Sequence, residues 1–358
     1  MTIEQNLAEG AMGIALLHLE AGRWHEAYAA LERAVADGVS IADGASLYYG
    51  APALAFVLAA ADHPGVAGAK VTAVEGTARV TRRRLEAAHR RIDRRERPHY
   101  AEFDLIRGLT GLGVVLRRIG DLDLLRDVLV YLVRLTEPLH GLPGWWCPTG
   151  PRYDESNPAG GHSNHGMAHG IAGPLALMAL TMLDGVEVNG QRAAIIRICQ
   201  WLDEWERRSG DSTWWPQVVT LDDLRRGDTS QPGPLRPSWC YGTPGIARAQ
   251  QLAGRALGDT IRQRKAETAF AACVSDPTQL DRLIDRGLCH GTAGLVATAR
   301  RISADALTPI PLAPVLDLHR RAAAAPDEPP GLLDGTAGAA LATAGTTTTR
   351  WDACLLLC

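Results

Sequence analysis

The chain has 358 residues, of which 46% are hydrophobic and 22% charged, an ordinary composition for a globular protein with a substantial core. Its formal net charge of -3 argues against a nucleic-acid partner. No stretch approaches the ~20 apolar residues of a membrane span, and the N-terminus shows no signal peptide. We therefore expect a cytoplasmic protein that is not an integral membrane protein, with its seven cysteines reduced.

A short glycine signature followed by an apolar helical run recurs along the whole chain. Its copies begin at Glu9, Tyr48, Ile106, Ala168, Cys240, Cys289 and Leu333. The second copy is weak, because Ala53 stands where the other copies have a second glycine. The copies lie roughly 40 to 70 residues apart, a period that is typical of repeat architectures.

Each copy predicts the same local structure. The first glycine suits a tight turn that enters a helix, and the second lets that helix start close to a neighbouring backbone. The following residues are apolar on nearly every side, as in "GPLALMAL", which indicates a buried helix. Amphipathic segments such as "AAIIRICQWLDEWERR" lie between the copies and suit an outer layer, whereas convincing alternating strand patterns are absent.

One inner and one outer helix per unit, repeated seven times, predict an all-α fold. We expect an α/α toroid, a double ring of inner and outer helices, formed as a single domain by residues 1–358. An open solenoid is the alternative, but the buried glycine-rich helices and the lack of polar capping repeats favour closure. The glycine turns would then meet at one end of a central funnel, where the residue before each first glycine decides the chemistry. These residues are Glu9, Tyr49, Arg107, His169, Tyr241, His290 and Asp334.

The fifth and sixth copies contain metal-type ligands in matching positions: Cys240, Cys289 and His290. Two thiolates and an imidazole suit zinc, which takes four protein ligands in structural sites and three in catalytic sites. No fourth cysteine occupies a matching position, so the pattern predicts an open, catalytic zinc site.

The other cysteines and histidines are expected to be structural, with one exception. We interpret five cysteines as small buried hydrophobic residues: Cys147, Cys199, Cys273, Cys354 and Cys358. In "GHSNHGMAHG", His169 occupies the rim position and is a candidate for function, whereas His162 and His165 are interpreted as loop residues. The glycines of this segment argue against a continuous helix that would pair His165 with His169.

Two charged segments allow a second interpretation. Residues 81–97, "TRRRLEAAHRRIDRRER", suit the solvated face of a basic helix, and the alternative is a docking strip for an acidic partner segment. The segment "LDDLRRGD" around Asp222 is interpreted as a surface loop. It is the only hint of the carboxylate groups that an α/α-barrel glycosidase or a terpene cyclase would need.

Five segments together resemble the lanthionine synthetase C-like family over nearly the entire chain. They are "FDLIRGLTG" (103–111), "GMAHGIAGPLALM" (166–178), "RPSWCYGTPG" (236–245), "LCHGTAGL" (288–295) and "LLDGTAGAALA" (332–342). The pair of Trp-Cys-Tyr-Gly and Cys-His-Gly is the specific part of the match. Within the family, the stand-alone LanC cyclases of class I lantibiotic biosynthesis fit best, because the chain has no room for the kinase and lyase domains of fused relatives.

The resemblance implies an α/α toroid that holds zinc through Cys240, Cys289 and His290. The family's active-site residues correspond to His169, Asp104, Arg236 and Tyr241. The implied substrate is a dehydrated precursor peptide, with a lantibiotic dehydratase and an exporter as candidate partners. Association with a membrane through such a complex is an alternative to a free cytoplasmic enzyme.

The implied reaction is a zinc-dependent Michael addition of peptide cysteine thiols to dehydroalanine or dehydrobutyrine, which closes lanthionine or methyllanthionine rings. Zinc would deprotonate the thiol, and Arg236 would stabilise the enolate that forms. His169 would transfer a proton, oriented by Asp104. Tyr241 would donate a hydrogen bond or line the funnel. The alternative function is a zinc-bearing protein that binds thiols or peptides without turnover.

Overall fold

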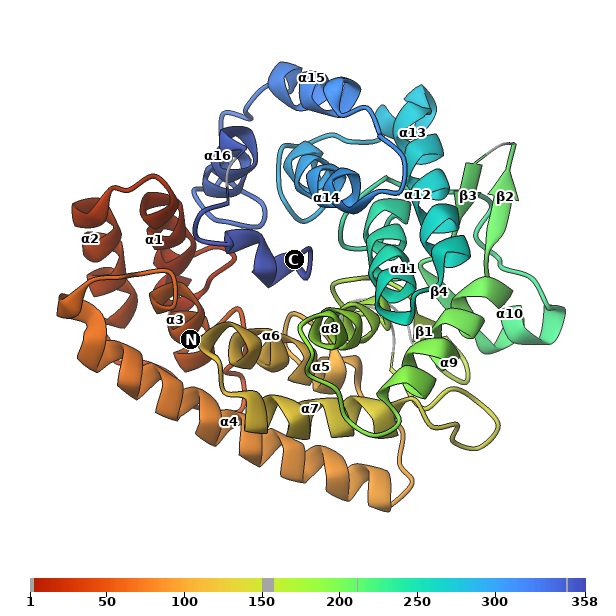
Figure 1. Cartoon of the computed structure of the whole chain (residues 1–358), viewed down its shortest axis with the longest axis horizontal. Helices are drawn as coiled ribbons and strands as arrows, with labels where there is room; N and C mark the ends of the chain where they lie inside the picture. The colour runs from red at the N-terminus through yellow and green to blue at the C-terminus, as the bar shows by residue number, and fades with distance from the viewer. Residues whose placement is uncertain (1–2, 150–157, 211, 346) are drawn as a thin grey trace.

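The computed structural model describes residues 3–149, 158–210, 212–345 and 347–358, and these form a closed double ring of helices (Figure 1). The seven inner helices found there each follow one glycine signature: α1 (Ala11–Glu20), α3 (Ala51–Leu58), α6 (Leu109–Ile119), α8 (Ala172–Leu183), α11 (Thr243–Leu257), α14 (Thr292–Asp305) and α16 (Thr336–Ala344). Outside them lie α2 (Trp24–Val35), α4 (Ala67–Asp93), α7 (Leu122–Leu135), α9 (Gln191–Glu204), α12 (Thr260–Ser275) and α15 (Ala313–Arg321). The predicted all-α toroid is confirmed.

Short helical elements lie between or beyond the helices of the two layers. They are η1 (Ile3–Gln5), η2 (Pro64–Val66), α5 (Tyr100–Phe103), α10 (Leu221–Arg226), α13 (Pro277–Leu280) and η3 (Trp351–Leu355). Strand β1 (His162–Asn164) pairs antiparallel with β4 (Val218–Thr220), and β2 (Arg207–Ser209) pairs antiparallel with β3 (Ser212–Trp214). These three-residue strands are too short to show an alternating pattern in the sequence. The interpretation of His162 as a loop residue is therefore wrong, and Asp222 lies on the surface helix α10 rather than in a loop.

Main-chain hydrogen bonds join neighbouring glycine turns around the ring. Amide-to-carbonyl bonds run from Leu7 to Tyr48 (2.9 Å), Leu105 to Ala168 (3.1 Å), Ala168 to Cys240 (3.3 Å), Cys240 to Cys289 (3.2 Å), Cys289 to Leu333 (2.9 Å) and Leu333 to Ala8 (3.0 Å). The last of these joins the seventh turn to the first. The ring is closed by this bond, so the open solenoid is excluded.

The seventh unit departs from the predicted pairing of inner and outer helices. After α16, the described residues 347–358 form no outer helix, and the chain instead turns toward the axis of the ring (Figure 1). The segment 351–357, which we call the tail, is almost completely buried there. Its sequence, "WDACLLL", is apolar apart from Asp352, which is consistent with this central position.

Where a signature has its second glycine, this residue packs against a carbonyl of its own turn, which yields a stability prediction. A Cβ added to Gly294 would lie 2.0 Å from the Leu288 carbonyl oxygen, so Gly294→Ala should lower the free energy of unfolding by about 2–3 kcal/mol. The control is Gly68 in α4, where an added Cβ meets nothing within 4 Å. Gly68→Ala should raise the free energy of unfolding by up to about 1 kcal/mol. Urea unfolding measures both; equal effects of the two substitutions would contradict the packing argument.

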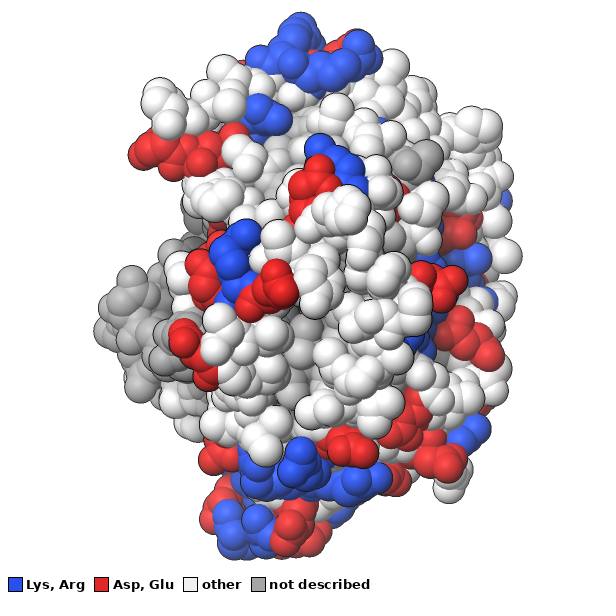
Figure 2. Space-filling view, turned by 90° about the vertical axis from the view of Figure 1, so that its left-hand side faces the viewer, with Lys and Arg blue, Asp and Glu red and all other residues white. Residues whose placement is uncertain are grey.

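The arginine-rich segment 81–97 covers the C-terminal part of α4 and the turn after it. In Figure 2, the blue atoms at the lower edge, over α4, are interleaved with red ones. Arg91 forms an ion pair with Glu102 (2.7 Å), and Arg84 and Arg97 donate to main-chain carbonyls. These three arginines stabilise the fold, and a docking role for the rest of the segment stays a prediction.

Among the helices that the structure describes, none is both long enough and apolar enough to cross a membrane.

Candidate metal centre

The predicted zinc ligands come together at the end of the ring where the glycine turns meet. Cys240 lies three residues before α11, and Cys289 and His290 lie just before α14. The amide of Cys240 donates to the carbonyl of Cys289 (3.2 Å), which holds the two turns side by side. One ligand atom from each of the three residues lies within 4.8 Å of the other two. In the described part of the chain, no other group of three histidine, cysteine or acidic residues has this geometry.

The donor set fits a zinc ion. Tetrahedral zinc with thiolates at about 2.3 Å places two sulfurs about 3.8 Å apart, within the spread of this cluster. Two sulfurs and an imidazole nitrogen are donors that zinc favours. Cys240 is only 7% exposed, while Cys289 and His290 are partly exposed toward a cavity. Cys240, Cys289 and His290 would hold such an ion through three protein ligands, which would leave room for a fourth ligand from this cavity.

The two thiols shift each other's pKa in opposite directions. The pKa of Cys240 lies well below its ordinary value, chiefly because the Cys289 thiol donates a hydrogen bond to the Cys240 thiolate. The same bond raises the pKa of Cys289 well above its ordinary value. Helices α11 and α14 begin shortly after the two cysteines in the chain. The positive ends of their dipoles also favour a negative charge on the cysteine sulfurs. The pair therefore loses its first proton readily, and a cation is needed to stabilise the second thiolate.

Two carboxylates flank the imidazole of His290. Its Nε2 lies 3.4 Å from Asp285 Oδ2, and its Nδ1 lies 3.6 Å from Asp334 Oδ1. The pKa of His290 is raised, first by its hydrogen bond with Cys240 and then by these carboxylates. Histidine ligands of metals commonly have such a carboxylate at the second ring nitrogen. Asp285 Oδ2 also lies 3.8 Å from Arg236 Nη1, so it connects the cluster to the predicted catalytic arginine.

Asp104 and His169, which the sequence could not place in contact, form a direct pair. Asp104 Oδ2 lies 2.6 Å from His169 Nδ1. The other oxygen, Oδ1, accepts from the amides of Arg107 and Gly108, both at 2.7 Å, and the side chain is fully buried. The carboxylate is thus held rigidly by the turn before α6. With Nδ1 engaged, Nε2 is the nitrogen that His169 offers to the cavity it lines.

Tyr241 lies beside His169 and is positioned by a residue that the sequence analysis missed. Asn164 Nδ2 donates to the Tyr241 hydroxyl (3.1 Å), and Asn164 Oδ1 accepts from the amide of Gly166 (2.9 Å). The ring centroids of Tyr241 and His169 are 6.3 Å apart. Asn164 is 1% exposed in β1, and its role could be found only once that strand was placed.

One cavity of about 1070 Å³ brings these groups together. Its lining includes the three zinc-ligand candidates together with His169, Arg236 and Tyr241, while Asp104 lies behind His169. Residues 232–235 and Arg282 form a further part of the wall, and Arg282 donates to the Pro234 carbonyl. This volume lies at the upper end of the range for ligand pockets, about 300–1,000 Å³, so the cavity has room for a few residues of a peptide. The wall residues carry no sequence signal, because they belong to irregular loops.

The remaining cysteines and histidines lie apart from this cavity. Burial raises the pKa values of Cys199, Cys273 and Cys354 to about 12, as expected for inert thiols. His162 and His165 are fully buried, and burial lowers their pKa values to about 4 and about 3. His165 Nε2 accepts from the Trp201 indole (2.9 Å), and no helix pairs it with His169.

Comparisons with known proteins identify the family of the chain. The family model of the "Lanthionine synthetase C-like protein" matches residues 2–356. The nisin biosynthesis protein NisC of Lactococcus lactis subsp. lactis is 26% identical over 202 residues, which cover 54% of this chain and 48% of that protein. The chain thus spans about half the length of this curated relative.

A solved structure, nisin cyclase, has the same architecture. It superposes with a TM-score of 0.85 at 21% sequence identity, covering 99% of this chain and 92% of the other. This likeness shows the toroid fold. Because the family model spans nearly all of the sequence and the structures agree from end to end, the chain belongs to the lanthionine synthetase C-like family.

Proposed function

We propose that this chain is a zinc-dependent peptide cyclase. It would form lanthionine or methyllanthionine rings by adding cysteine thiols to dehydroalanine or dehydrobutyrine in a dehydrated lanthipeptide precursor. The observation that carries the proposal is the single cavity lined by both His169 and the cluster of Cys240, Cys289 and His290. A proton-transferring pair beside a set of metal ligands supports turnover rather than binding alone.

Cys240, Cys289 and His290 would hold the zinc. When bound, zinc supplies the positive charge that lowers the pKa of a substrate thiol from its ordinary value near ~8.5. The two cysteine ligands offset the charge of the ion, so that a thiolate from the substrate stays electron-rich.

His169, paired with Asp104, would transfer the proton between the substrate thiol and the α-carbon. In the addition, the substrate sulfur forms a bond with the β-carbon of the dehydroamino acid, and the π electrons move toward the amide oxygen. His169 Nε2 accepts the proton that leaves the thiol or donates a proton to the α-carbon. Asp104 keeps Nδ1 of His169 protonated, which leaves Nε2 to perform the exchange. The product has the same mass as the substrate.

Arg236 and Tyr241 would stabilise the enolate oxygen. Both line the cavity, and the Arg236 guanidinium carries a permanent charge. Asp285 lies close enough to limit where Arg236 can point. Asn164 restrains the phenol of Tyr241 through the hydrogen bond that its Nδ2 donates to the hydroxyl.

The partners follow from this chemistry. A dehydratase must supply the dehydroamino acids, and an exporter is a further expected partner of a lanthipeptide-producing complex. We place the reaction in the cytoplasm, with residues 81–97 as one surface that could meet a precursor peptide.

The proposal is tested with a synthetic peptide that contains one dehydroalanine and one cysteine. We expect the protein to abolish alkylation of the peptide thiol while the peptide mass before alkylation stays unchanged. A reaction without protein at the same pH measures spontaneous closure. If the protein retains the peptide but the thiol remains fully alkylatable, the chain is a binding protein and the proposed activity is wrong.

A further inference from the structure

The tail lies near the axis of the ring (Figure 1). Every residue from 351 to 357 is at most 6% exposed, although the segment follows the last inner helix and has no outer helix to cover it. Figure 1 shows η3 surrounded by the inner helices. The tail is therefore part of the core that the inner ring packs around.

Side chains from the second and fifth units bond to the tail carbonyls. The Tyr48 hydroxyl donates to the Cys354 carbonyl (2.8 Å), and the Trp239 indole Nε1 donates to the Leu355 carbonyl (2.9 Å). Arg248 Nη2 donates to the Leu357 carbonyl (2.6 Å). A short 3-10 helix leaves its last carbonyls without internal partners, and these side chains supply them in a buried place.

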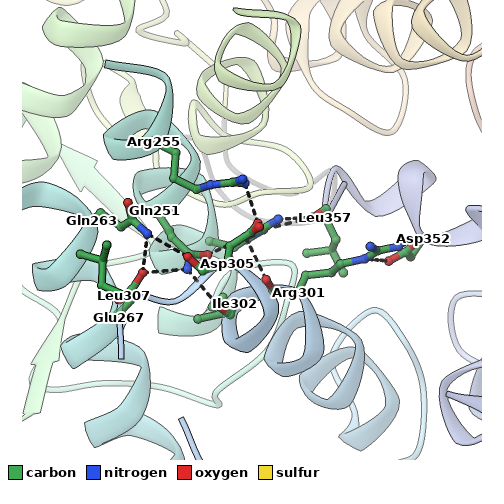
Figure 3. A network of polar contacts seen from close by, with 11 residues as sticks. Gln251, Arg255, Gln263, Glu267, Arg301, Ile302, Asp305, Leu307, Asp352 and Leu357 are labelled. Atoms are coloured by element: carbon green, nitrogen blue, oxygen red, sulfur yellow. Dashed lines mark hydrogen bonds and ion pairs between the residues drawn. The ribbon is translucent and has the colours of Figure 1, made fainter. Parts of the chain in front are cut away.

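A second set of contacts joins the tail to the helices that follow the metal ligands. Arg301 of α14 forms a two-bond ion pair with Asp352 (2.5 and 2.8 Å), as Figure 3 shows. Arg248 of α11 is 2% exposed, and besides Leu357 it pairs with Asp305 of α14 (2.8 Å). Helices α11 and α14 each begin three residues after one of the two cysteines of the metal centre. The tail thus bonds to both of the helices that present a ligand.

Trp239 connects the tail with the metal centre itself. It directly precedes Cys240 in the chain, and its side chain is fully buried. Its indole is fixed at the Leu355 carbonyl, and a Cβ on Gly245 would come within 2.0 Å of its carbonyl oxygen. The next residue, Cys240, is fixed through its own amide at Cys289. On the other side of its Cα, the Cys240 carbonyl accepts from the amide of Ala168 (3.3 Å), so the main chain on both sides of the Cα is held in place.

We propose that Trp239 is a positioning residue for the Cys240 ligand and that the tail, through the Leu355 carbonyl, is its anchor. The inference rests on the proposed function only in taking the cluster as a zinc site. Without the indole N–H, the Leu355 carbonyl would be left buried without this donor, and the turn that carries Cys240 would sample other positions. Zinc affinity would fall, because a ligand set binds tightly only when its geometry is fixed in advance.

The first test compares two buried tryptophans that make the same kind of bond. Trp239→Phe removes the bond to the tail, while Trp215→Phe removes an indole bond to the Leu202 carbonyl (3.0 Å) that does not involve the tail. In competition with a chromogenic chelator, Trp239→Phe should weaken Zn²⁺ binding about 10-fold, whereas Trp215→Phe should not. The Co²⁺-substituted Trp239→Phe protein should also show an altered thiolate-to-metal charge-transfer band. Equal Zn²⁺ affinities and equal Co²⁺ spectra for the two variants would overturn the proposal.

The second test loosens the tail from its other end, in case Trp239→Phe does not fold. Arg301→Gln breaks the ion pair with Asp352, while Arg300→Gln changes the neighbouring arginine, which bonds to the Ala342 carbonyl of α16. Arg301→Gln should increase amide hydrogen exchange in residues 351–357. It should also weaken Zn²⁺ binding about 3- to 10-fold. Arg300→Gln should do neither. Faster exchange of the tail without any loss of Zn²⁺ affinity would overturn the proposal.

Cyclase activity and the positioning role of Trp239 are tested separately. If the wild-type protein does not cyclise the peptide but Trp239→Phe still weakens Zn²⁺ binding, the proposed function fails and the positioning role stands. If the wild-type protein cyclises the peptide and the two tryptophan variants bind Zn²⁺ alike, the positioning role fails alone.

Discussion

Replacing Cys289 by alanine is expected to leave the protein with little bound zinc and almost no cyclase activity. The substitution leaves two protein ligands, Cys240 and His290, where a catalytic zinc site takes three. We expect the zinc content to fall from about one ion per chain to below about a tenth of that value. Loss of the metal should slow cyclisation about 10³-fold or more, since metal ions contribute several kcal/mol to such reactions. Metal analysis and thiol alkylation of the peptide measure the two effects.

Cys273→Ala is the matched control for this prediction. Cys273 is 1% exposed in α12 and lies outside the cavity, so its replacement removes a buried thiol without touching the cluster. That variant should keep its zinc and its activity. Full zinc content in Cys289→Ala would show that the ligand assignment is wrong.

Asp104→Asn should have the second-largest effect, a loss of about 10²–10⁴-fold in the rate of cyclisation with zinc content unchanged. The asparagine can still accept from the amides of Arg107 and Gly108 through one oxygen. Its NH₂ group would then face His169 Nδ1 and hold the imidazole in the wrong tautomer. His169→Ala should lose a similar amount, because both changes remove the same proton transfer. Rates are measured by the disappearance of alkylatable thiol.

Asp121→Asn controls for the loss of an aspartate at a helix start. Asp121 caps α7 through the amide of Leu124 (3.2 Å), and an asparagine can make the same bond. We expect this variant to cyclise at the wild-type rate. A wild-type rate in Asp104→Asn as well would mean that the pair with His169 has no part in the chemistry.

The ring of inner helices was predictable because its signal is local. The few residues around Gly242 or Gly291 are enough to predict the helix that follows each glycine. The apolar surface of that helix predicts that it belongs to the inner layer. The repeat then places equivalent residues at the same end of the ring. Cys240 and Cys289 are far apart in sequence, yet their register in the repeat is enough to bring them together.

Contacts made by irregular segments were not predictable in this way. The sequence suggested that Asp104 orients His169 but held no evidence that they touch, since their contact depends on how two neighbouring turns are tilted. Asn164 lies in a strand too short to recognise, and Asp285 lies in a loop. Both residues act at the site through contacts with residues of other units or loops.

For the tail, the sequence predicted burial but not location. Its apolar composition predicted burial of Cys354, and the structure confirms it, but composition does not say where an apolar segment lies. Only the placement of Leu355 against Trp239 connects the tail with the metal centre. The expectation of a single domain over residues 1–358 stays a prediction.

The most direct measurement of the central claim is the number of free peptide thiols after reaction with metal-free and zinc-restored protein. The account predicts that protein stripped of metal by a chelator leaves the thiol alkylatable. It also predicts that about one equivalent of Zn²⁺ per chain restores ring closure. The same peptide mass and the loss of one alkylatable thiol would be seen only in the restored sample. Equal ring closure in the stripped and restored samples, or none in either, would contradict the account.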